Sequence, residues 1–312
     1  MQLLLKEKGV IRSLFRWVGR CGQKKGYHMA VGDKGVNTGI VQVLSWNAYE
    51  WLRHGFSGRE GGVSTVYGGN SLNLGWTKED DPALVAENRR RFYDASQGNL
   101  GGKAGFPAVT LRQTHSAVIR SIREEDGVFE GSLHTAEGKA VLEGDGAVTN
   151  LPGVMLGVQT ADCVPVLVAD VSKRVVGAFH AGWRGTVARI VERGIEVMRL
   201  EYGSRPGDLV AAVGPSIGTC CYAVGEEVQS EFGAQFGYAE TLFRAADDGQ
   251  MHLDLWEANR RQLVDAWVSA ERITVVGECT ACMVAGGQRK YFSHRAERGF
   301  TGRMMSVIGV VE

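Results

Sequence analysis

The sequence predicts a mixed α/β fold in one domain, and two patterns carry that prediction. From residue 41 onward, apolar stretches of strand length alternate with stretches in which apolar residues recur at helical spacing. Several of the strand-length stretches are apolar at nearly every position, which is typical of strands buried on both faces. No internal repeat or linker interrupts residues 41–312, so we expect a single domain there.

The first predicted elements surround a long glycine-rich segment. A strand is predicted over 41–46, and the Gly-, Ser- and Asn-rich residues 54–75 are predicted to form a functional loop. Residues 80–96 have the pattern of a helix, with Pro82 in its first turn. The alternation of polar and apolar residues over 108–122 predicts a strand that runs to or past His115.

The second half of the chain is predicted to hold most of the buried sheet. Residues 153–161, 163–170 and 175–183 are nearly continuous apolar stretches and are predicted to be buried strands. Residues 186–202 are predicted to form a helix, because their apolar side chains recur on one face. The remaining predicted elements are strands over 209–218 and 272–280, helices over 224–236 and 253–268, and a last strand at the end of 291–312.

Composition argues against several classes of protein. The chain has 35 Lys and Arg residues against 35 Asp and Glu residues, so no excess of positive charge favours a nucleic-acid partner. No run approaches about 18 apolar residues, the length that a membrane span requires. Six cysteines in 312 residues are far below the density of a disulfide scaffold. Together with the lack of a secretory signal, this favours a cytoplasmic protein.

Residues 1–40 are predicted to be a basic N-terminal extension that is poorly ordered. Residues 1–28 contain seven Lys or Arg residues and a single Glu. Arginine recurs every fourth residue from Arg12 to Arg20, so a membrane-surface or organelle-targeting helix is the alternative interpretation. Scarce serine argues against a transit peptide, and we favour a loosely docked extension upstream of Met29.

Cys279 and Cys282 form an isolated C-x-x-C motif. A zinc knuckle needs a second pair of ligands, and the adjacent Cys220 and Cys221 do not have the usual spacing. We therefore expect Cys279 and Cys282 to be packing residues rather than metal or redox residues, and assign no role to Cys220 and Cys221.

Three predicted strands end in a residue that could coordinate a metal. His115 lies in RQTHSA, Cys163 in TADC and His180 in AFHAGWRG, each where a buried strand gives way to a turn. The 17 residues from Cys163 to His180 correspond to a strand, a turn and a strand, which could return the chain to the same sheet edge. Two imidazoles and a thiolate suit zinc with an open fourth position, and the same donors also suit copper.

Two other interpretations of these residues stay open. A single histidine after a strand is often a rim or core residue, and a cysteine in an apolar run is often a small hydrophobic residue. Alternatively, Cys163 is a nucleophile and a histidine its base, with Asp162 orienting that histidine or holding a substrate hydroxyl.

Three arginines are placed where anions could bind. Arg59 lies in the glycine-rich loop, Arg184 lies near a predicted helix start, and Arg303 lies in TGRMMS; of these, Arg303 has the weakest support. Solvated surface arginine is the alternative for each. The chain contains no Walker A sequence and no G-x-G-x-x-G after a strand, so ATPase and dinucleotide-binding functions lack support.

Seven motifs in order carry a resemblance to a known family over about residues 45–310. They are HGFSGREGGVS…SLNLG, DDPALVAENRRRF, LRQTHSA, GDGAVTNLPGVMLGVQTADCVPVLVAD…VVGAFHAGWRGTV, AVGPSIGTCCYAVGEEV, LDLWEANRRQL and YFSHR…TGRMMSVIGV. Together they resemble the YfiH-like family, also described as the multicopper polyphenol oxidase (laccase-domain) or purine nucleoside phosphorylase family.

The resemblance implies a fold, a cofactor and an activity. The implied fold is a single α/β domain of mixed sheets layered between helices (αββα-like), and the implied cofactor is Zn2+, with Cu2+ as the alternative. The implied reactions are phosphorolysis of adenosine, inosine or methylthioadenosine and deamination of adenosine, by a monomer or homodimer whose partners are nucleoside and phosphate. A copper-dependent, laccase-like phenol oxidase and a cysteine-type hydrolase that edits a peptidoglycan precursor remain alternatives.

The resemblance also assigns site residues. The implied metal ligands are His115, Cys163 and His180, which with Asp162 form the catalytic set; the implied substrate- or phosphate-binding residues are Arg59, Asn73, Gln113 and Arg184. Two departures from the family pattern bear on the site. Gly58 replaces the hydroxyl residue of FSTR or FTTR, and His294 stands where relatives often carry Tyr.

Overall fold

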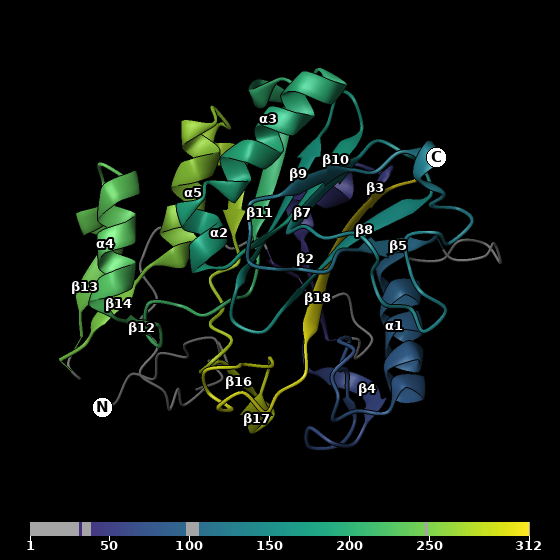
Figure 1. Cartoon of the computed structure of the whole chain (residues 1–312), viewed down its shortest axis with the longest axis horizontal. Helices are drawn as coiled ribbons and strands as arrows, with labels where there is room; N and C mark the ends of the chain where they lie inside the picture. Colours follow the sequence, from purple (N-terminus) through teal and green to yellow (C-terminus); the bar gives the residue numbers. More distant parts are fainter. Residues whose placement is uncertain (1–30, 33–38, 98–105, 247–248, 312) are drawn as a thin grey trace, which may run out of the picture.

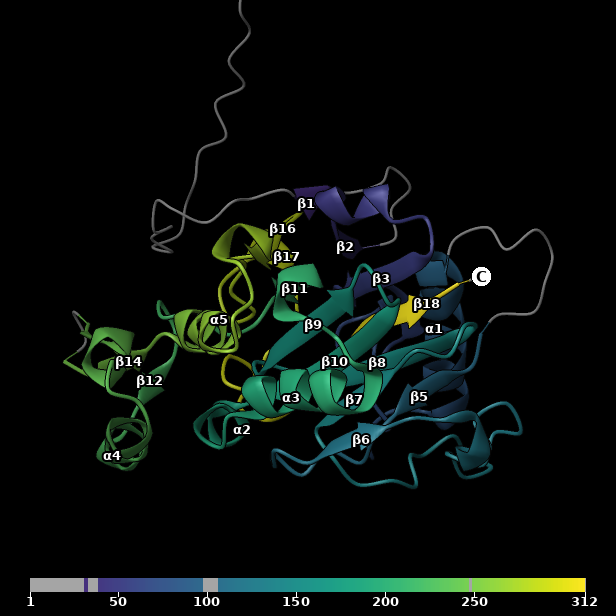
Figure 2. The same cartoon turned by 90° about the horizontal axis from the view of Figure 1, so that it is seen from above.

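Four layers, in the order helix, sheet, sheet, helix, make up the fold (Figure 1). The computed structural model describes residues 31–32, 39–97, 106–246 and 249–311. Two six-stranded sheets form the inner layers. Figure 2 shows α1 on one side of the strands and α3 and α5 on the other. The predicted mixed α/β class, with sheets layered between helices, is confirmed.

The first sheet has the strand order β1-β2-β3-β18-β8-β5. Its neighbours are antiparallel except for β5 and β8, which are parallel. The strands are β1 (Val31–Gly32), β2 (Ile40–Val43), β3 (Leu52–Ser57), β5 (Ala108–Thr110), β8 (Val154–Thr160) and β18 (Met304–Val310).

The second sheet has the strand order β15-β11-β9-β10-β7-β6. The outer pairs β15–β11 and β7–β6 are parallel, and the central pairs are antiparallel. The strands are β6 (Ile119–Ser121), β7 (Gly146–Thr149), β9 (Val164–Asp170), β10 (Val175–Ala181), β11 (Leu209–Val213) and β15 (Ile273–Val275).

Helices and small strands complete the described chain. The α-helices are α1 (Pro82–Gln97), α2 (Trp183–Val187), α3 (Ile190–Tyr202), α4 (Glu226–Gln235) and α5 (Leu255–Asp265). The small strands are β4 (Glu60–Ser64), β12 (Ala223–Val224), β13 (Phe243–Ala245), β14 (Met251–Leu253), β16 (Val284–Ala285) and β17 (Gln288–Arg289). Short 3-10 helices span Leu44–Ala48, Glu124–Asp126, Pro206–Asp208, Ala239–Leu242 and Ala270–Arg272.

The continuous apolar runs in the sequence arise because both faces of the central strands are buried. Along β10, Val176 and Ala178 point into the core between the two sheets, whereas Val175 and Phe179 point into the core under the helices. Successive side chains of a strand point to opposite faces, so a strand covered on both sides has to be apolar at every position.

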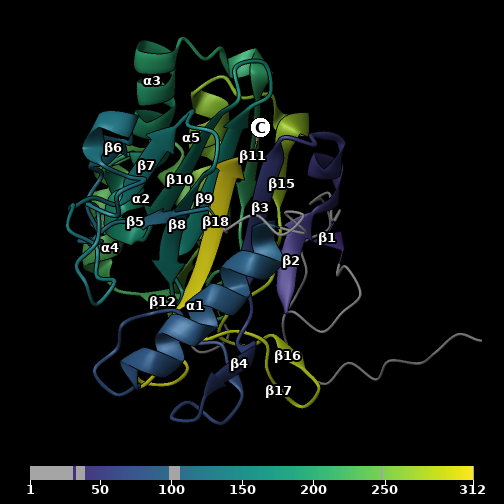
Figure 3. The same cartoon turned by 90° about the vertical axis from the view of Figure 1, so that its right-hand side faces the viewer.

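Helix α3 packs closely against β10 because glycines leave room for Phe179. A Cβ atom on Gly194 of α3 would lie 2.3 Å from the Phe179 ring, and one on Gly177 of β10 would lie 2.7 Å from it. Helix α1 lies along the outer face of the first sheet (Figure 3). Its Phe92 packs against Met155 and Met305. Both helix layers are thus held by apolar side chains from central strands.

The predicted strand over 108–122 is wrong. The segment contains two three-residue strands in different sheets, β5 and β6, and the residues between them cross from one sheet to the other. His115 lies in this crossing and has a positive φ of 60°. The alternation of apolar residues therefore continues through a segment whose backbone leaves the strand conformation.

Three other predicted elements also differ from the structure. The predicted loop over 54–75 contains most of β3 and all of β4, and the predicted strand over 41–46 ends at Val43 and continues as a 3-10 helix. The predicted helix over 186–202 is interrupted between α2 and α3, where Arg189 has a φ of 60°. A left-handed residue cannot continue a right-handed helix, and the apolar periodicity does not reveal it.

The predicted N-terminal extension over 1–40 lies largely outside the described residues. The described part includes β1, which pairs antiparallel with β2 at the edge of the first sheet. Among the described residues, no helix combines the length and the apolar character needed to cross a bilayer.

Candidate metal centre

The candidate site lies where the chain passes twice between the two sheets. One passage joins β5 to β6 and carries His115; the other joins β8 to β9 and carries Asp162 and Cys163. Both His115 and Asp162 have positive φ angles, of 60° and 95°. Non-glycine residues rarely adopt such angles, and those that do are concentrated at functional sites.

The three predicted metal ligands come together at these crossings. His180 lies near the end of β10, and the β9–β10 hairpin pairs it with Pro165, close to Cys163. The ligand atoms of His115, Cys163 and His180 lie within 4.8 Å of one another. His180 is buried, Cys163 is half-buried and His115 is exposed, so the cluster is open to solvent on one side.

Asp145 supports two of these ligands, and the sequence analysis did not identify it. Its buried carboxylate accepts a hydrogen bond of 2.8 Å from Nδ1 of His180 and one of 3.0 Å from the backbone N–H of His115. It also accepts hydrogen bonds from the backbone N–H (2.7 Å) and Oγ (2.6 Å) of Ser116. The carboxylate thereby directs Nε2 of His180 towards the other ligands and fixes the backbone that carries His115.

Electrostatics at the site favours charged forms of the buried groups. Burial would raise the pKa of Asp145, but hydrogen bonds from His180 and Ser116 hold it below its usual range. Burial also raises the pKa of the Cys163 thiol, and the neighbouring His180 and His115 more than offset this, so the net shift is downward. Burial lowers the pKa of His180, whereas the Cys163 thiolate and Asp145 raise it overall. These shifts favour a thiolate at Cys163 beside a protonated His180.

This donor set fits a zinc ion. Zinc binds imidazole nitrogen at about 2.0–2.1 Å and thiolate sulfur at about 2.3 Å, so ligand atoms this close can share one ion after small side-chain adjustments. The carboxylate behind His180 is the usual outer partner of a zinc-bound histidine. Two imidazoles and one thiolate also suit copper, so the donors do not by themselves select the metal.

Gly182 allows the ligands to approach the backbone that follows β10. A Cβ atom on Gly182 would lie 2.9 Å from Sγ of Cys163 and 3.2 Å from Cδ2 of His115. Any larger residue would therefore push against two of the three ligands.

A cavity of about 640 Å3 opens in front of the three ligands. Its wall includes two arginines and one tyrosine, Arg295, Arg303 and Tyr222. The remaining lining residues are Leu111, Gln113, His115, Gln159, Thr160, Ala161, Asp162, Cys163, His180, Ile217 and His294. Its volume lies within the range for small-molecule sites, about 300–1,000 Å3.

Asp162 lines the cavity and also anchors its wall. Its Oδ1 accepts hydrogen bonds of 2.7 Å from the hydroxyls of Thr280 and Ser293, and its Oδ2 accepts one of 2.7 Å from the backbone N–H of Arg295. The sequence offers Asp162 as a residue that orients a histidine; in the structure, Asp145 makes that contact with His180.

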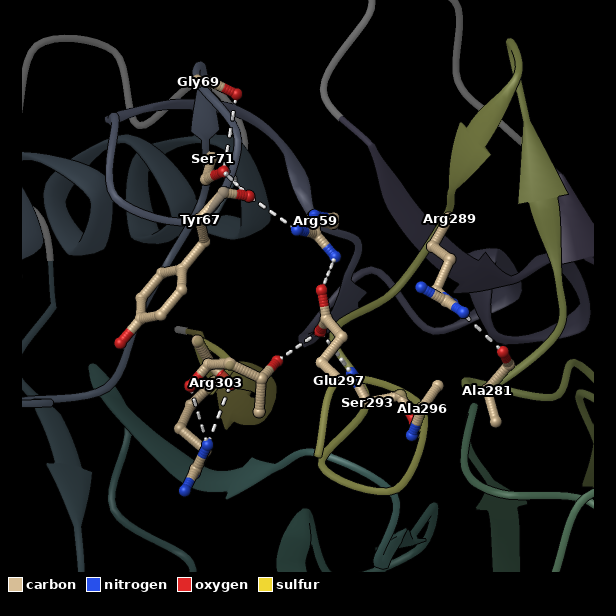
Figure 4. A network of polar contacts seen from close by, with 12 residues as sticks. Arg59, Tyr67, Gly69, Ser71, Ala281, Arg289, Ser293, Ala296, Glu297 and Arg303 are labelled. Atoms are coloured by element: carbon tan, nitrogen blue, oxygen red, sulfur yellow. Dashed lines mark hydrogen bonds and ion pairs between the residues drawn. The ribbon is translucent and has the colours of Figure 1, made fainter. Parts of the chain in front are cut away.

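Arg59 is not among the residues that line the cavity, and its side chain points towards Glu297 (Figure 4). Its guanidinium pairs with Glu297 and donates to the backbone oxygen of Tyr67, and it lies 4.9 Å from the centre of the Phe292 ring. Glu297 in turn accepts hydrogen bonds from Thr301 Oγ1 and the Ser293 backbone. These contacts tie the glycine-rich segment to the loop after Phe292.

The other three predicted substrate-binding residues lie in different surroundings. Gln113 lines the cavity and exchanges two hydrogen bonds with the backbone of Gln159. Asn73 is fully buried and contacts Asp80 (2.7 Å), outside the cavity lining. Arg184 is exposed, also outside that lining, and stacks on Trp183 with 4.2 Å between the guanidinium carbon and the ring centre.

The two arginines in the cavity wall are Arg303, for which the sequence gives weak support as an anion site, and Arg295, which no sequence pattern indicated. Arg303 donates through Nη1 to the backbone oxygens of Thr301 and Gly302, which holds the side chain beside the cavity (Figure 4). Arg295 donates to the backbone oxygen of Ala223 and lies over the ring of Tyr222. Arg295 lies in the last polar loop and Arg303 directly before the last strand, β18. Neither follows the end of an apolar strand, which is the pattern that pointed to the other site residues.

Comparison with known proteins places these features in a wider group. Residues 53–311 match the model of a family described as "Multi-copper polyphenol oxidoreductase laccase". The chain is 36% identical over 283 residues to "Purine nucleoside phosphorylase YlmD" of Geobacillus stearothermophilus, covering 86% of this chain and 98% of that protein. It is 40% identical over 201 residues to "Adenosine deaminase RL5" from an unknown prokaryotic organism, covering 62% of this chain and 73% of that protein.

A solved structure shares the fold. The crystal structure of YlmD from Geobacillus stearothermophilus superposes with a TM-score of 0.77 at 32% sequence identity. The match covers 91% of this chain and 99% of that chain.

Proposed function

This chain belongs to the family described as multi-copper polyphenol oxidoreductase laccase, and on that premise we propose that it is a zinc-dependent purine nucleoside enzyme. The proposed reactions are phosphorolysis of adenosine, inosine and methylthioadenosine and deamination of adenosine. Relatives named purine nucleoside phosphorylase and adenosine deaminase support both parts of the proposal.

One observation carries the proposal: His115, Cys163 and His180 converge at the base of an open cavity, and Asp145 holds two of them. A metal held by these residues would act as a Lewis acid and stabilise negative charge that develops on the substrate. The exposed side of the cluster, at His115, is where a nucleoside would approach.

The chain's own residues would bind and orient the substrates of phosphorolysis. We assign the phosphate to Arg295 and Arg303, because both lie in the cavity wall and guanidinium groups match phosphate geometry. A phosphate oxygen forms a bond to the anomeric carbon, the bond from that carbon to the purine breaks, and the purine leaves with the electron pair. The departing purine then takes up a proton, which we assign to His294 at the exposed edge of the cavity.

In deamination, water replaces the amino group of the purine ring and ammonia leaves. The proton has to move from water to the departing amine, and we assign this transfer to Asp162 or to one of the cavity histidines. Asp162 is anchored through both carboxylate oxygens, so its position relative to the substrate is fixed before the substrate binds.

The decisive experiment incubates the purified full chain with adenosine, with and without phosphate, and separates adenine from inosine by chromatography. The expected result is adenine that requires phosphate, inosine that does not, and loss of both in Cys163→Ser. Release of neither product by metal-loaded protein overturns the proposal. Measured copper together with dye oxidation supports the phenol oxidase alternative; activity that survives strong chelation but is lost in Cys163→Ser supports the cysteine hydrolase.

The phosphate assignment has its own test. Replacing Arg303 with Gln is expected to raise the KM for phosphate by about 10-fold or more, because a charge-assisted contact of about 1.5–3 kcal/mol is lost. The KM for adenosine in deamination should stay within about twofold, because that reaction uses no phosphate. The control is Arg199→Gln on α3, whose guanidinium is exposed and pairs with Glu196. An unchanged phosphate KM in Arg303→Gln contradicts the assignment.

A further inference from the structure

Four cysteines come together outside the site described above. Cys220 and Cys221 lie in the turn after β11, and Cys279 and Cys282 lie in the turn after β15. The strands β11 and β15 are parallel neighbours, so their ends bring the two turns to the same edge of the sheet. The bridge between Ser216 and Cys279 continues this pairing into the turns.

The four sulfur atoms lie within 4.8 Å of one another, although 62 residues separate Cys220 from Cys282. The isolated C-x-x-C motif predicts that Cys279 and Cys282 are packing residues, because the adjacent Cys220 and Cys221 lack the usual spacing of a ligand pair. The structure brings the two pairs together through the sheet rather than through a local knuckle, so spacing along the chain did not reveal the cluster.

We propose that these four cysteines bind a structural zinc ion, separate from the ion proposed for His115, Cys163 and His180. The distance between the sulfurs of Cys220 and Cys282 is 3.6 Å. Two thiolates on one tetrahedral zinc ion, at about 2.3 Å from the metal, lie about 3.8 Å apart. The sulfurs of a disulfide are only about 2.05 Å apart. The observed distance is close to that of the zinc geometry.

The surroundings suit a closed thiolate site. Cys279 is buried and the other three cysteines are half-buried, so protein atoms supply four ligands and leave no position for a substrate. The backbone N–H of Gly218 donates to Sγ of Cys279 at 3.3 Å, which stabilises negative charge on that sulfur. Nε of Arg289 donates to the backbone oxygen of Ala281, between the two cysteines of the second turn, and brings positive charge nearby (Figure 4).

Local packing also requires the close approach of the two turns. A Cβ atom on Gly218 would lie 2.8 Å from the Trp256 ring and 3.4 Å from Sγ of Cys220. Ile217 and Ala281 form a small apolar cluster with Cys279. The first turn is therefore seated against the second by backbone and apolar contacts, which places the sulfurs without help from the ion.

The proposed ion would stabilise one wall of the substrate cavity. Tyr222, directly after the first cysteine pair, lines the cavity. Thr280, between the cysteines of the second turn, donates its hydroxyl to Asp162 at 2.7 Å. A zinc ion that joins the two turns would hold both of these residues in place while taking no part in the chemistry.

The test measures metal content and needs no knowledge of the reaction. The full chain is produced in zinc-supplemented medium, purified without chelator under anaerobic conditions, and analysed for bound metal per chain. The expected content is two zinc ions in the unmodified chain and one in the double variant His115→Ala/His180→Ala. After exchange with cobalt, that double variant should keep an intense thiolate-to-cobalt absorption band, since four thiolates remain.

Variants within the cluster complete the design. Cys282→Ala should lose one ion and unfold at lower temperature, whereas Cys282→His should keep the ion, because imidazole can replace a thiolate on zinc. The control is Cys21→Ser. Cys21 is the one cysteine that belongs to neither proposed site, and it lies outside the described residues, so this variant should keep both ions. If Cys282→Ala does not fold, the double histidine variant alone decides the question.

Two results would overturn the proposal. One is a single ion in the unmodified chain with none in the double histidine variant. The other is a disulfide between Cys220 and Cys282, found by peptide mapping of the anaerobically purified protein. If the unmodified chain binds two zinc ions but has no activity on nucleosides, the proposed function is wrong and the structural zinc site is still supported.

Discussion

Replacing Asp145 with Asn removes the charge that supports two of the proposed metal ligands. Asparagine keeps one carbonyl oxygen, which can still accept from Nδ1 of His180 and from the N–H of His115 where Oδ1 of Asp145 now lies. Its amide nitrogen would then occupy the position of Oδ2, which accepts hydrogen bonds from Ser116. A donor would face the backbone donor of Ser116, so the crossing that carries His115 loses its hydrogen bonds to Oδ2 while the contact at Oδ1 remains.

The magnitude has two parts. Ser116 is half-buried, and leaving its N–H without an acceptor costs about 1–3 kcal/mol of folding free energy. Thr114, whose N–H also contacts Asp145, is exposed and can turn to water, so it adds little. Loss of an outer-shell partner typically weakens metal binding by about 10- to 100-fold, which corresponds to about 1.4–2.8 kcal/mol.

The assay is competition with a chromophoric zinc chelator, combined with denaturant unfolding of the metal-free protein. The His115→Ala variant provides the baseline, because zinc that it still withholds from the chelator is not bound at this centre. Ser116→Ala is the matched control: it removes one donor of 2.6 Å but leaves the carboxylate intact. We expect that control to lose about 1 kcal/mol and to change zinc affinity by less than about threefold, well below the outer-shell effect.

Zinc affinity of Asp145→Asn within twofold of the unmodified chain would refute this account of the site. It would mean that the backbone of the crossing holds His115 without the carboxylate. A loss of folding free energy alone, with metal affinity unchanged, would make Asp145 a residue of the fold rather than of the metal centre.

Further predictions concern the backbone and the support around the cavity. Gly182→Ala should lower zinc affinity by about 10-fold or more, since its Cβ would press on Cys163, whereas Gly207→Ala, with nothing within 4 Å, should be neutral by the same titration. Glu297→Gln should destabilise the fold by about 1–3 kcal/mol near neutral pH, because a charged acceptor is lost. Burial would raise the pKa of Glu297, but Thr301 and Arg59 lower it overall, so its stabilisation is complete above the unfolded pKa of about 4.3. It is lost as pH falls through the lower folded pKa, and unfolding curves of the two proteins should therefore converge in acid; curves that stay parallel to pH 3 would contradict this.

The sequence predicted the parts of the fold that depend on burial. Strands β9 and β10 are apolar at nearly every position, and this pattern identified them and the turn that brings Cys163 near His180. The prediction failed where the backbone changes direction without a change in composition. The crossing at His115 and the break at Arg189 both depend on a single left-handed residue that is not glycine.

The three candidate ligands and the cavity residues Asp162 and Gln113 could be predicted, but the groups that support them could not. Cys163 lies just after β8 and His180 near the end of β10, and the end of an apolar strand is visible in a sequence. The function of Asp145 depends on how residues 114–116 wrap around its carboxylate, and no spacing rule encodes that contact. The same limit applies to the arginines, because Arg59 and Arg303 differ in their hydrogen-bond partners rather than in their type.

The two passages of the chain between the sheets have a consequence for how the protein unfolds. An ion bound by His115, Cys163 and His180 would hold residues of both passages as well as the end of β10, so the sheets could not separate without releasing it. Binding to the folded form alone adds about 4.1 kcal/mol of stability when free metal is 1,000 times its Kd. Amide hydrogens of β5 and β6, the short strands that one passage joins, should therefore exchange with solvent at a rate set by free zinc. The free zinc concentration would then control how long the two sheets stay packed together, in addition to any reaction that the ion supports.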